Sequence, residues 1–206
     1  MAEPASKDSS GQYFEPSPSS RSAPKEIRLD LPDLSLTLAT DRGVFSPDRI
    51  DTGTKHLLLD GPMPAEAGTL VDLGCGYGPI ACALARRSPA ATVLAIDVNE
   101  RALDLCRSNA ERLGLTNVHA VSAERVAAEL VIDELWSNPP IRIGKAHLHQ
   151  VLGTWLGRLA PTGRALLVVQ KHLGADSLHR WMESEGWSVD RRSSRAGYRV
   201  LEVRAA

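Results

Sequence analysis

The segment Thr69-Leu-Val-Asp-Leu-Gly-Cys-Gly-Tyr-Gly-Pro79 joins an apolar run to three glycines, spaced G-x-G-x-G, and a proline. The apolar run predicts a strand that is covered on both faces. Glycine lets a loop turn sharply and brings bare backbone close to a ligand. Pro79 can open the next helix, because a proline at the first helical position gives up no hydrogen bond. The segment therefore predicts a strand, a ligand-binding loop and a helix in direct succession.

Strand-like and helical segments alternate from this point to the end of the chain. We expect strands near residues 69–73, 92–96, 117–121, 132–136, 164–170, 187–192 and 198–203, and helices near residues 79–87, 99–113, 146–158 and 175–185. This alternation predicts an α/β fold with a Rossmann-like, doubly wound sheet of seven mostly parallel strands. A short turn at 192–197 joins the last two strands, so we expect them to form an antiparallel hairpin at the sheet edge, with the last strand antiparallel to the others.

The residues before this sheet divide into two parts. Segments 26–31 and 34–39 alternate apolar and polar residues on either side of Pro32-Asp33, which predicts a β-hairpin, and a helix is expected at 51–59. Residues 1–23 are rich in serine and proline and are expected to form a disordered tail. Within it, Tyr13 and Phe14 either dock onto the domain or stay exposed. We therefore expect a tail (1–23) and one domain (24–206), with the hairpin and helix in 24–60 and the core in 61–206.

The composition is typical of a soluble globular protein, with 43% hydrophobic and 24% charged residues among 206. No apolar run is long enough to predict a membrane span or a signal peptide. Cys75, Cys82 and Cys106 match no zinc spacing, so we expect reduced thiols in a cytoplasmic protein and no metal site. The formal net charge of −1 argues against binding nucleic acid with the whole surface, and any such binding needs a local basic patch or a partner.

An acidic residue ends the second expected strand of the sheet. Asp97 lies 19 residues after Gly78, where a carboxylate can accept hydrogen bonds from both hydroxyls of a ribose. Asp72, just before the glycines, is placed to face an amino group of the ligand. A glycine loop alone can be a tight strand–helix turn, but a loop followed by a strand-end acid at this distance favours a cofactor site.

Ser137-Asn-Pro-Pro-Ile141 follows the fourth expected strand of the sheet. Proline cannot continue a central strand, so the segment predicts a stiff loop at the carboxyl edge, where open α/β sheets bind ligands. The Asn138 side-chain carbonyl and the Pro139 backbone carbonyl can each accept one hydrogen of an amine. Together they would draw its nitrogen toward tetrahedral geometry and aim the lone pair. The alternative is a simple Asn-Pro turn.

The segments Asp72–Gly78 and Asp97-Val-Asn99 resemble the first two motifs of class I methyltransferases that use S-adenosylmethionine (SAM). Together with Thr40–Ser46, Asp51–Lys55 and Ser137–Lys145, they make nearly the whole chain similar to the methyltransferase small domain family, in its short, single-domain form. The resemblance implies SAM as cofactor and methylation of a guanine N2, with ribosomal RNA or the small ribosomal subunit as partner and no membrane. Methylation of a protein glutamine N5 or an adenine N6 stays open, as does a non-catalytic SAM-binding module.

The resemblance and the loop positions give the expected site residues. The catalytic set is Asn138, Pro139 and Pro140, and the substrate set is Phe45, Ile141, Arg142 and Lys145. The cofactor set is Asp72, Gly74, Cys75, Gly76, Tyr77, Gly78, Asp97, Val98, Ser122 and Asn138. Ser122 stands where the superfamily often has an acid that bonds adenine, and Glu124 is the alternative. Ile141 stands where an aromatic residue is usual, so stacking on the target base falls to Phe45 or another ring, unless Phe45 is a core residue.

Basic residues cluster beside the expected catalytic loop, and they could bind phosphates. This group is Arg142, Lys145, His147 and His149. The two histidines are two residues apart on a helix and do not share a face, which makes a metal site there unexpected. Lys171 and His172 follow the fifth strand on the same edge. Arg191, Arg192 and Arg195 either extend the basic patch or form a solvated hairpin tip.

Overall fold

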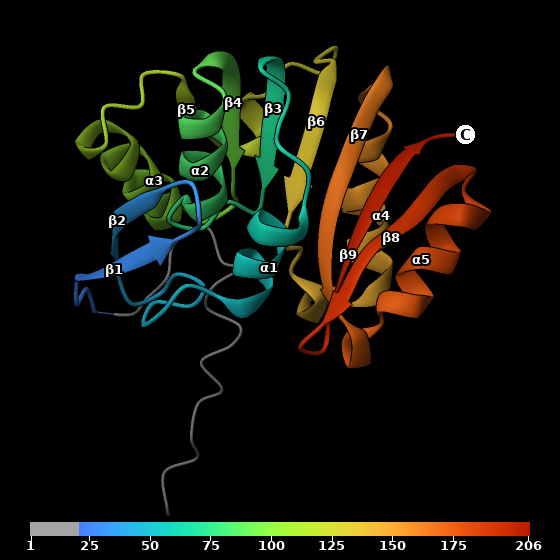
Figure 1. Cartoon of the computed structure of the whole chain (residues 1–206), viewed down its shortest axis with the longest axis horizontal. Helices are drawn as coiled ribbons and strands as arrows, with labels where there is room; N and C mark the ends of the chain where they lie inside the picture. The colour runs from blue at the N-terminus through green and yellow to red at the C-terminus, as the bar shows by residue number, and fades with distance from the viewer. Residues whose placement is uncertain (1–20) are drawn as a thin grey trace, which may run out of the picture.

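Seven strands form one sheet in the order β5-β4-β3-β6-β7-β9-β8 in the computed structural model, which describes residues 21–206 (Figure 1). The strands are β3 (Ala67–Leu73), β4 (Ala90–Ile96), β5 (Val118–Val121), β6 (Ile132–Ser137), β7 (Leu159–Gln170), β8 (Trp187–Arg195) and β9 (Tyr198–Ala205). β9 pairs antiparallel with β7 and β8, and the other pairs are parallel. The predicted sheet and its antiparallel last strand are confirmed. The expected tail, with Tyr13 and Phe14, lies outside the described residues except for residues 21–23.

Helices cover both faces of the sheet, which explains the unbroken apolar runs in its central strands. α1 (Thr52–Asp60), α2 (Pro79–Arg87) and α3 (Glu100–Arg112) pack on one face, and α4 (Lys145–Leu156) and α5 (Ala175–Ser184) pack on the other. In β7, Leu166 and Val168 enter the first core while Leu167 and Val169 enter the second. The described residues also include the short 3₁₀ turns η2 (Ala123–Arg125), η3 (Ile141–Ile143) and η4 (Lys171–Leu173). Within residues 21–206, no helix is both long and apolar enough to cross a membrane.

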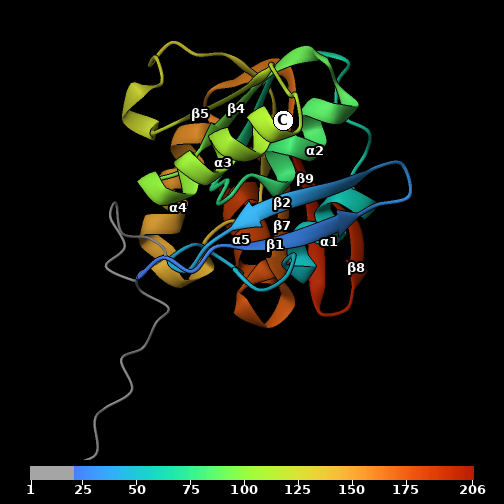
Figure 2. The same ribbon diagram turned by 90° about the vertical axis from the view of Figure 1, so that its left-hand side faces the viewer.

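The predicted hairpin is present outside the sheet, formed by β1 (Lys25–Asp30) and β2 (Ser35–Thr40), and Figure 2 shows it on the side of α2 and α3. Asn109 of α3 holds it there. The Asn109 amide accepts from Ala39 N at 2.7 Å and donates to Ala39 O at 2.8 Å. The same Nδ2 donates to Tyr77 O of the glycine loop at 2.9 Å. One buried asparagine therefore connects the hairpin to the loop.

A buried ion pair joins β6 to β7 near the amino edge of the sheet. Glu134 is 3% exposed, and its carboxylate accepts from Ala65 N, Trp136 Nε1 and Arg164 Nε. A buried charge is tolerated only when a partner and hydrogen bonds replace the lost water. Arg164 supplies the opposite charge, and the two N–H groups occupy the remaining lone pairs.

We predict that Arg164→Met lowers the free energy of unfolding by about 3–5 kcal/mol, because it leaves the Glu134 carboxylate buried without a cation. Denaturant unfolding measures this loss. Arg204→Met is the matched control, since Glu202 keeps its ion pair with Arg192 and the loss should stay below about 1 kcal/mol. Equal losses in the two variants would show that the ion pair of Glu134 with Arg164 contributes no more to the free energy of unfolding than that of Glu202 with Arg204.

Candidate functional site

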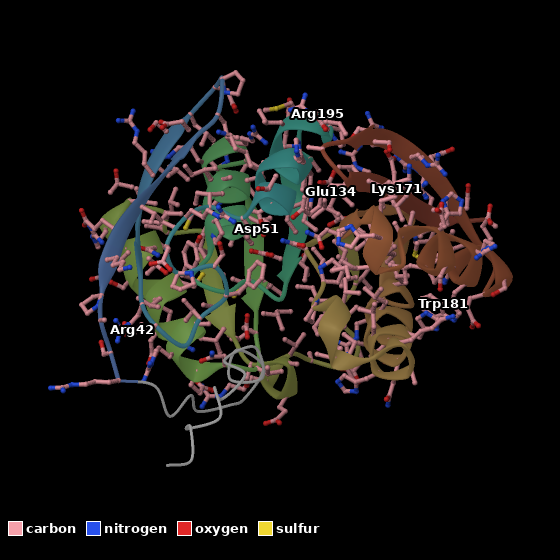
Figure 3. The ribbon with its side chains drawn as sticks, turned by 90° about the horizontal axis from the view of Figure 1, so that it is seen from below. Arg42, Asp51, Glu134, Lys171, Trp181 and Arg195 are labelled. Atoms are coloured by element: carbon pink, nitrogen blue, oxygen red, sulfur yellow. The ribbon has the colours of Figure 1, made fainter. Side chains whose placement is uncertain are left out.

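The candidate site lies where three parallel strands end at one edge of the sheet. β3 ends at Leu73, β4 at Ile96 and β6 at Ser137, and the pairings of β3 with β4 and β6 are both parallel. The loops that follow these strands therefore meet. Figure 3 views the molecule from this edge, with Asp51 near the middle. Ligands of open α/β sheets bind at such an edge.

The three glycines of the loop after β3 have different physical roles. All three have positive φ, at 77° for Gly74, 54° for Gly76 and 90° for Gly78. A Cβ added at Gly74 or Gly76 would meet no atom within 4 Å, so these two positions present bare backbone to open space. A Cβ at Gly78 would lie 2.6 Å from the sulfur of Cys106. Gly78 is therefore required for packing against α3, a contact that the spacing of the glycines does not reveal.

Asp97 connects the end of β4 to this loop. One carboxylate oxygen accepts from Gly76 N at 2.8 Å and the other accepts from Asn99 N at 3.0 Å. Burial raises the pKa of Asp97, although these N–H groups and that of Val98 oppose the rise. A carboxylate has four lone pairs in all, so Asp97 can still accept from a hydroxyl besides these N–H groups. Val98 beside it is half exposed.

Asp72 is fully buried beneath the start of α2. Its Oδ2 accepts from Ala81 N at 2.9 Å, and its Oδ1 has no hydrogen-bond partner. Burial raises the pKa of Asp72 to about 8, the Ala81 N–H opposes the rise, and the charge of Asp97 adds to it. An orphaned carboxyl oxygen in this position fits a cationic or N–H donor, such as the amino group of SAM.

The amide of Asn138 is held in one orientation. Its Nδ2 donates to Asp51 Oδ2 at 2.8 Å and to Thr54 Oγ1 at 3.1 Å. A carboxylate can only accept, so the nitrogen must be the atom that faces Asp51. The two N–H bonds are thereby used, and the carbonyl oxygen Oδ1 is left as a free acceptor. Ser137 Oγ donates to Leu73 O at 2.7 Å and anchors this loop to β3.

A cavity at the carboxyl edge brings many of the expected residues together. It is lined by Phe45, Asp51, Thr54, Gly74, Cys75, Gly76, Tyr77, Pro79, Ile80 and Asn138. Asp51 and Thr54 belong to the segment Asp51–Lys55 that carries part of the family resemblance, whereas Ile80 of α2 was not among the expected site residues. A second hollow, at the opposite edge, is lined by Glu134 and Arg164, which are already paired with each other. We therefore place the candidate site in the cavity at the carboxyl edge.

Several expected residues lie outside this cavity lining. They are Asp72, Gly78, Asp97, Val98, Ser122, Pro139, Pro140, Ile141 and Lys145, and the side chain of Arg142 is outside the described part of the chain. Pro139 O accepts from Ile141 N at 2.9 Å, which leaves one lone pair on this carbonyl. After β5, Ser122 is partly buried and Glu124 is exposed.

The two candidate platforms for a base differ in their surroundings. Ile141 is partly buried and packs against the core on the α4 face. Phe45 is 45% exposed and lines the cavity, so the reading of Phe45 as a core residue is wrong. An exposed ring beside Asn138 is suited to stacking on a planar ligand.

Some basic residues of this edge are exposed, and others stack on a ring or form ion pairs. Lys145, His147, Lys171 and His172 are exposed. His149 instead stacks on Trp181, with ring centroids 3.9 Å apart, and burial followed by the charge of Lys145 lowers its pKa. The hairpin arginines form ion pairs: Arg191 with Asp176, Arg192 with Glu202 and Arg195 with Asp60. These pairs favour a hairpin tip over an extended patch.

The three cysteines are buried and none forms a disulfide. Cys75 lies in the glycine loop, Cys82 in α2 and Cys106 in α3, and burial raises the pKa of the Cys75 and Cys82 thiols. Within residues 21–206, no group of three or more His, Cys, Asp or Glu side chains is arranged to hold a metal ion.

Comparison with known proteins identifies relatives along most of the chain. The methyltransferase small domain model matches residues 35–202. The uncharacterized protein YbxB of Bacillus subtilis is 32% identical over 198 residues, covering 95% of this chain and 98% of YbxB. Ribosomal RNA small subunit methyltransferase C of Shewanella halifaxensis is 32% identical over 150 residues, covering 71% of this chain and 43% of that protein.

Solved structures show the same fold. The T. thermophilus 16S rRNA N2 G1207 methyltransferase RsmC, in complex with AdoMet and guanosine, matches with a TM-score of 0.79 at 23% identity, over 90% of this chain and 52% of that chain. Precorrin-6y C5,15-methyltransferase of Geobacter metallireducens matches with a TM-score of 0.61 at 15% identity, over 74% of this chain and 87% of that chain. The chain thus spans about half of the methyltransferase C relatives that it matches.

The buried Asp72 predicts an unusual pH dependence of stability. Its folded pKa of about 8 exceeds its ordinary value of 3.8, so between these values the folded chain holds a proton that the unfolded chain has lost. The contribution of this group therefore falls as the pH rises. We expect the free energy of unfolding of the wild-type chain to decline relative to that of Asp72→Asn between about pH 4 and pH 8.

Denaturant unfolding of both chains across this range tests the prediction. The amide introduced by Asp72→Asn has no titrating proton, so the difference between the two chains reports the titration of Asp72 together with its coupling to Asp97. Parallel curves for the two chains would show that Asp72 is already ionised in the folded state.

Proposed function

The chain belongs to the methyltransferase small domain family, and we propose that it transfers the methyl group of SAM to the N2 amine of a guanine in small-subunit ribosomal RNA. As a member of this family it is a SAM-dependent methyltransferase. The observation that carries the proposal is the fixed Asn138 amide, whose carbonyl is the free acceptor in a cavity shared with the glycine loop. The choice of guanine is supported by the similarity to the 16S rRNA N2 G1207 methyltransferase, and that of ribosomal RNA also by methyltransferase C.

The residues at the carboxyl edge fit SAM. We propose that the Asp97 carboxylate accepts from the ribose hydroxyls, and that the orphaned Asp72 Oδ1 accepts from the amino group. The bare backbone at Gly74 and Gly76 allows close approach of the ligand. Val98 and Ser122 are the proposed neighbours of the adenine. Bound there, SAM supplies an electrophilic methyl group.

The chain's own contribution to the reaction is to hold the amine. The lone pair of an exocyclic amine is delocalised into the ring, which makes the nitrogen a weak nucleophile. Asn138 Oδ1 accepts one amine hydrogen, and the remaining lone pair of Pro139 O accepts the other. The nitrogen is thereby drawn toward tetrahedral geometry with its lone pair aimed at the methyl group. This is catalysis by positioning and by fixed dipoles, without a covalent intermediate.

The substrate side of the cavity fits a base better than an aliphatic group. Phe45 supplies the exposed ring, because Ile141 is engaged in the core of the α4 face. Exposed Lys145 and Lys171 can contact phosphates near the base. Figure 3 shows Lys171 on one side of Asp51 and Arg42 on the other, so cations flank the site on both sides. Since the net charge is −1, RNA binding would depend on such local cations or on a partner.

We predict that Asp97→Ala weakens SAM binding at least about tenfold, because each hydrogen bond to a charged group contributes roughly 1.5–3 kcal/mol. Calorimetric titration with SAM measures the affinity. Asp133→Ala is the control, since Asp133 also accepts a backbone N–H, from Thr69, but lies at the opposite edge. Unchanged affinity in Asp97→Ala would mean that the ribose lies elsewhere.

The proposed reaction is tested by transfer of a labelled SAM methyl group to four pools: naked ribosomal RNA, assembled small subunits, transfer RNA and total protein. We expect label in ribosomal RNA or subunits, recovered as N2-methylguanosine. Asn138→Ala should keep its SAM affinity and lose turnover by at least about a hundredfold, as expected when one preorganised transition-state contact is removed.

The other outcomes separate the alternatives. Label in protein alone would move the assignment to a glutamine-N5 methyltransferase, and N6-methyladenine in any of the three pools that contain RNA would move it to an adenine methyltransferase. SAM binding without any transfer would indicate a non-catalytic module. Normal turnover in Asn138→Ala would remove Asn138 from the reaction.

A further inference from the structure

We propose that Asp51 is a positioning residue that sets the orientation of the Asn138 amide, an inference that rests on the proposed role of Asn138. Asp51 lies directly before α1, far from Asn138 in the sequence. Its Oδ2 accepts from Asn138 Nδ2 at 2.8 Å and from Thr54 N at 3.1 Å. One oxygen therefore caps α1 and holds the amide of the proposed catalytic loop.

The oxygen and nitrogen ends of the Asn138 amide are nearly equal in shape. The Asp51 carboxylate distinguishes them because it can only accept a hydrogen bond. Turned over, the Asn138 amide would place Oδ1 against Asp51 Oδ2, two acceptors at hydrogen-bond distance, and would present Nδ2 to the target amine. That orientation brings a donor against a donor and leaves the amine hydrogen proposed to bind Oδ1 without an acceptor. Thr54 Oγ, the second contact of Nδ2, can donate as well as accept and tolerates either orientation. Among these two contacts, Asp51 alone selects the productive orientation.

The charge of Asp51 acts in the same direction. Hydrogen bonds to a charged acceptor are stronger than neutral ones, and they polarise the group that donates. The Asn138 carbonyl thus becomes a better acceptor. An amine that gains a methyl group develops positive charge, which a nearby carboxylate stabilises. The same charge reaches across the cavity, where burial and then Asp51 raise the pKa of Tyr77.

The Asp51 carboxylate and the Tyr198 ring both lie against Gly53 of α1. A Cβ added there would lie 2.9 Å from Asp51 Oδ2 and 2.8 Å from Cε1 of Tyr198. Both distances are shorter than a Cβ allows, so a side chain at position 53 would push the carboxylate or the Tyr198 ring. Because Gly53 has no side chain, α1 can lie close to Tyr198 of β9 while the Asp51 carboxylate bonds to Asn138.

Three variants separate positioning from helix capping. Asp51→Ser keeps a good N-cap, since serine caps helices about as well as aspartate, but its side chain is too short to reach Asn138. Asp51→Asn keeps both the cap and an oxygen that can accept from Asn138, but loses the charge. Asn138→Ala removes the amide on which Asp51 is proposed to act. The assay is methyl transfer from labelled SAM to whichever of the four pools the wild-type chain labels, with naked ribosomal RNA first.

Positioning predicts that Asp51→Ser retains its melting temperature within a few degrees and its SAM affinity within about threefold, while kcat falls roughly ten- to a hundredfold, as for loss of one charge-assisted hydrogen bond. Asp51→Asn should recover part of this loss. In the Asn138→Ala background, Asp51→Ser should cause no further loss in single-turnover rate, because both changes act through one amide.

Wild-type kcat in Asp51→Ser, or an equal loss in both backgrounds, would overturn the proposal and leave Asp51 as a helix cap. Failure of the proposed function has a different signature. It shows as normal turnover in Asn138→Ala, whatever the Asp51 variants do.

Discussion

The parallel pairing of β3 with β4 and β6 is the constraint on which the site depends. Leu73 pairs with Ile96, so the glycine loop and Asp97 leave the sheet side by side. Gly74 N and Cys75 N both donate to Ile96 O, at 2.8 and 2.9 Å, and fix the loop to the end of β4. The pairing of β3 with β6 brings the loop of Asn138 to the same edge. If β4 or β6 were reversed or shifted in register, the glycine loop, Asp97 and Asn138 would no longer lie together at one edge of the sheet.

The two sides of the cavity are built by different parts of the chain. The sheet and its loops supply the side proposed for SAM, with Gly74 and Gly76. The segment between β2 and α1, together with the start of α1, supplies the side proposed for the base, with Phe45 and Asp51. Ile141 packs into the core, and an aromatic ring is found instead across the cavity. Substrate preference can therefore change in the N-terminal segment without disturbing the cofactor loop.

The sequence predicted the sheet, its helices and the glycine loop because each depends on local signals: apolar runs, turn residues and a proline at a helix start. The roles of Gly78 and Glu134 were not predictable, since they depend on Cys106 in α3 and Arg164 in β7. The position of Asp51 suggests a helix cap, but the residues around it in the sequence do not indicate that Asn138 is its partner. Spacing reveals contacts within an element, whereas these contacts join elements far apart in the chain.

The hydrogen bond between Asp51 and Asn138 spans 87 residues, and this fixes the order in which the site is completed during synthesis. A nascent chain that has emerged through α3 already contains the glycine loop and Asp97. Asn138 arrives only after β5 and β6, when the closing of this long loop is compensated by sheet pairing. The residues proposed to bind SAM thus leave the ribosome before Asn138. A chain that stops short of β6 contains the glycine loop and Asp97 but lacks Asn138.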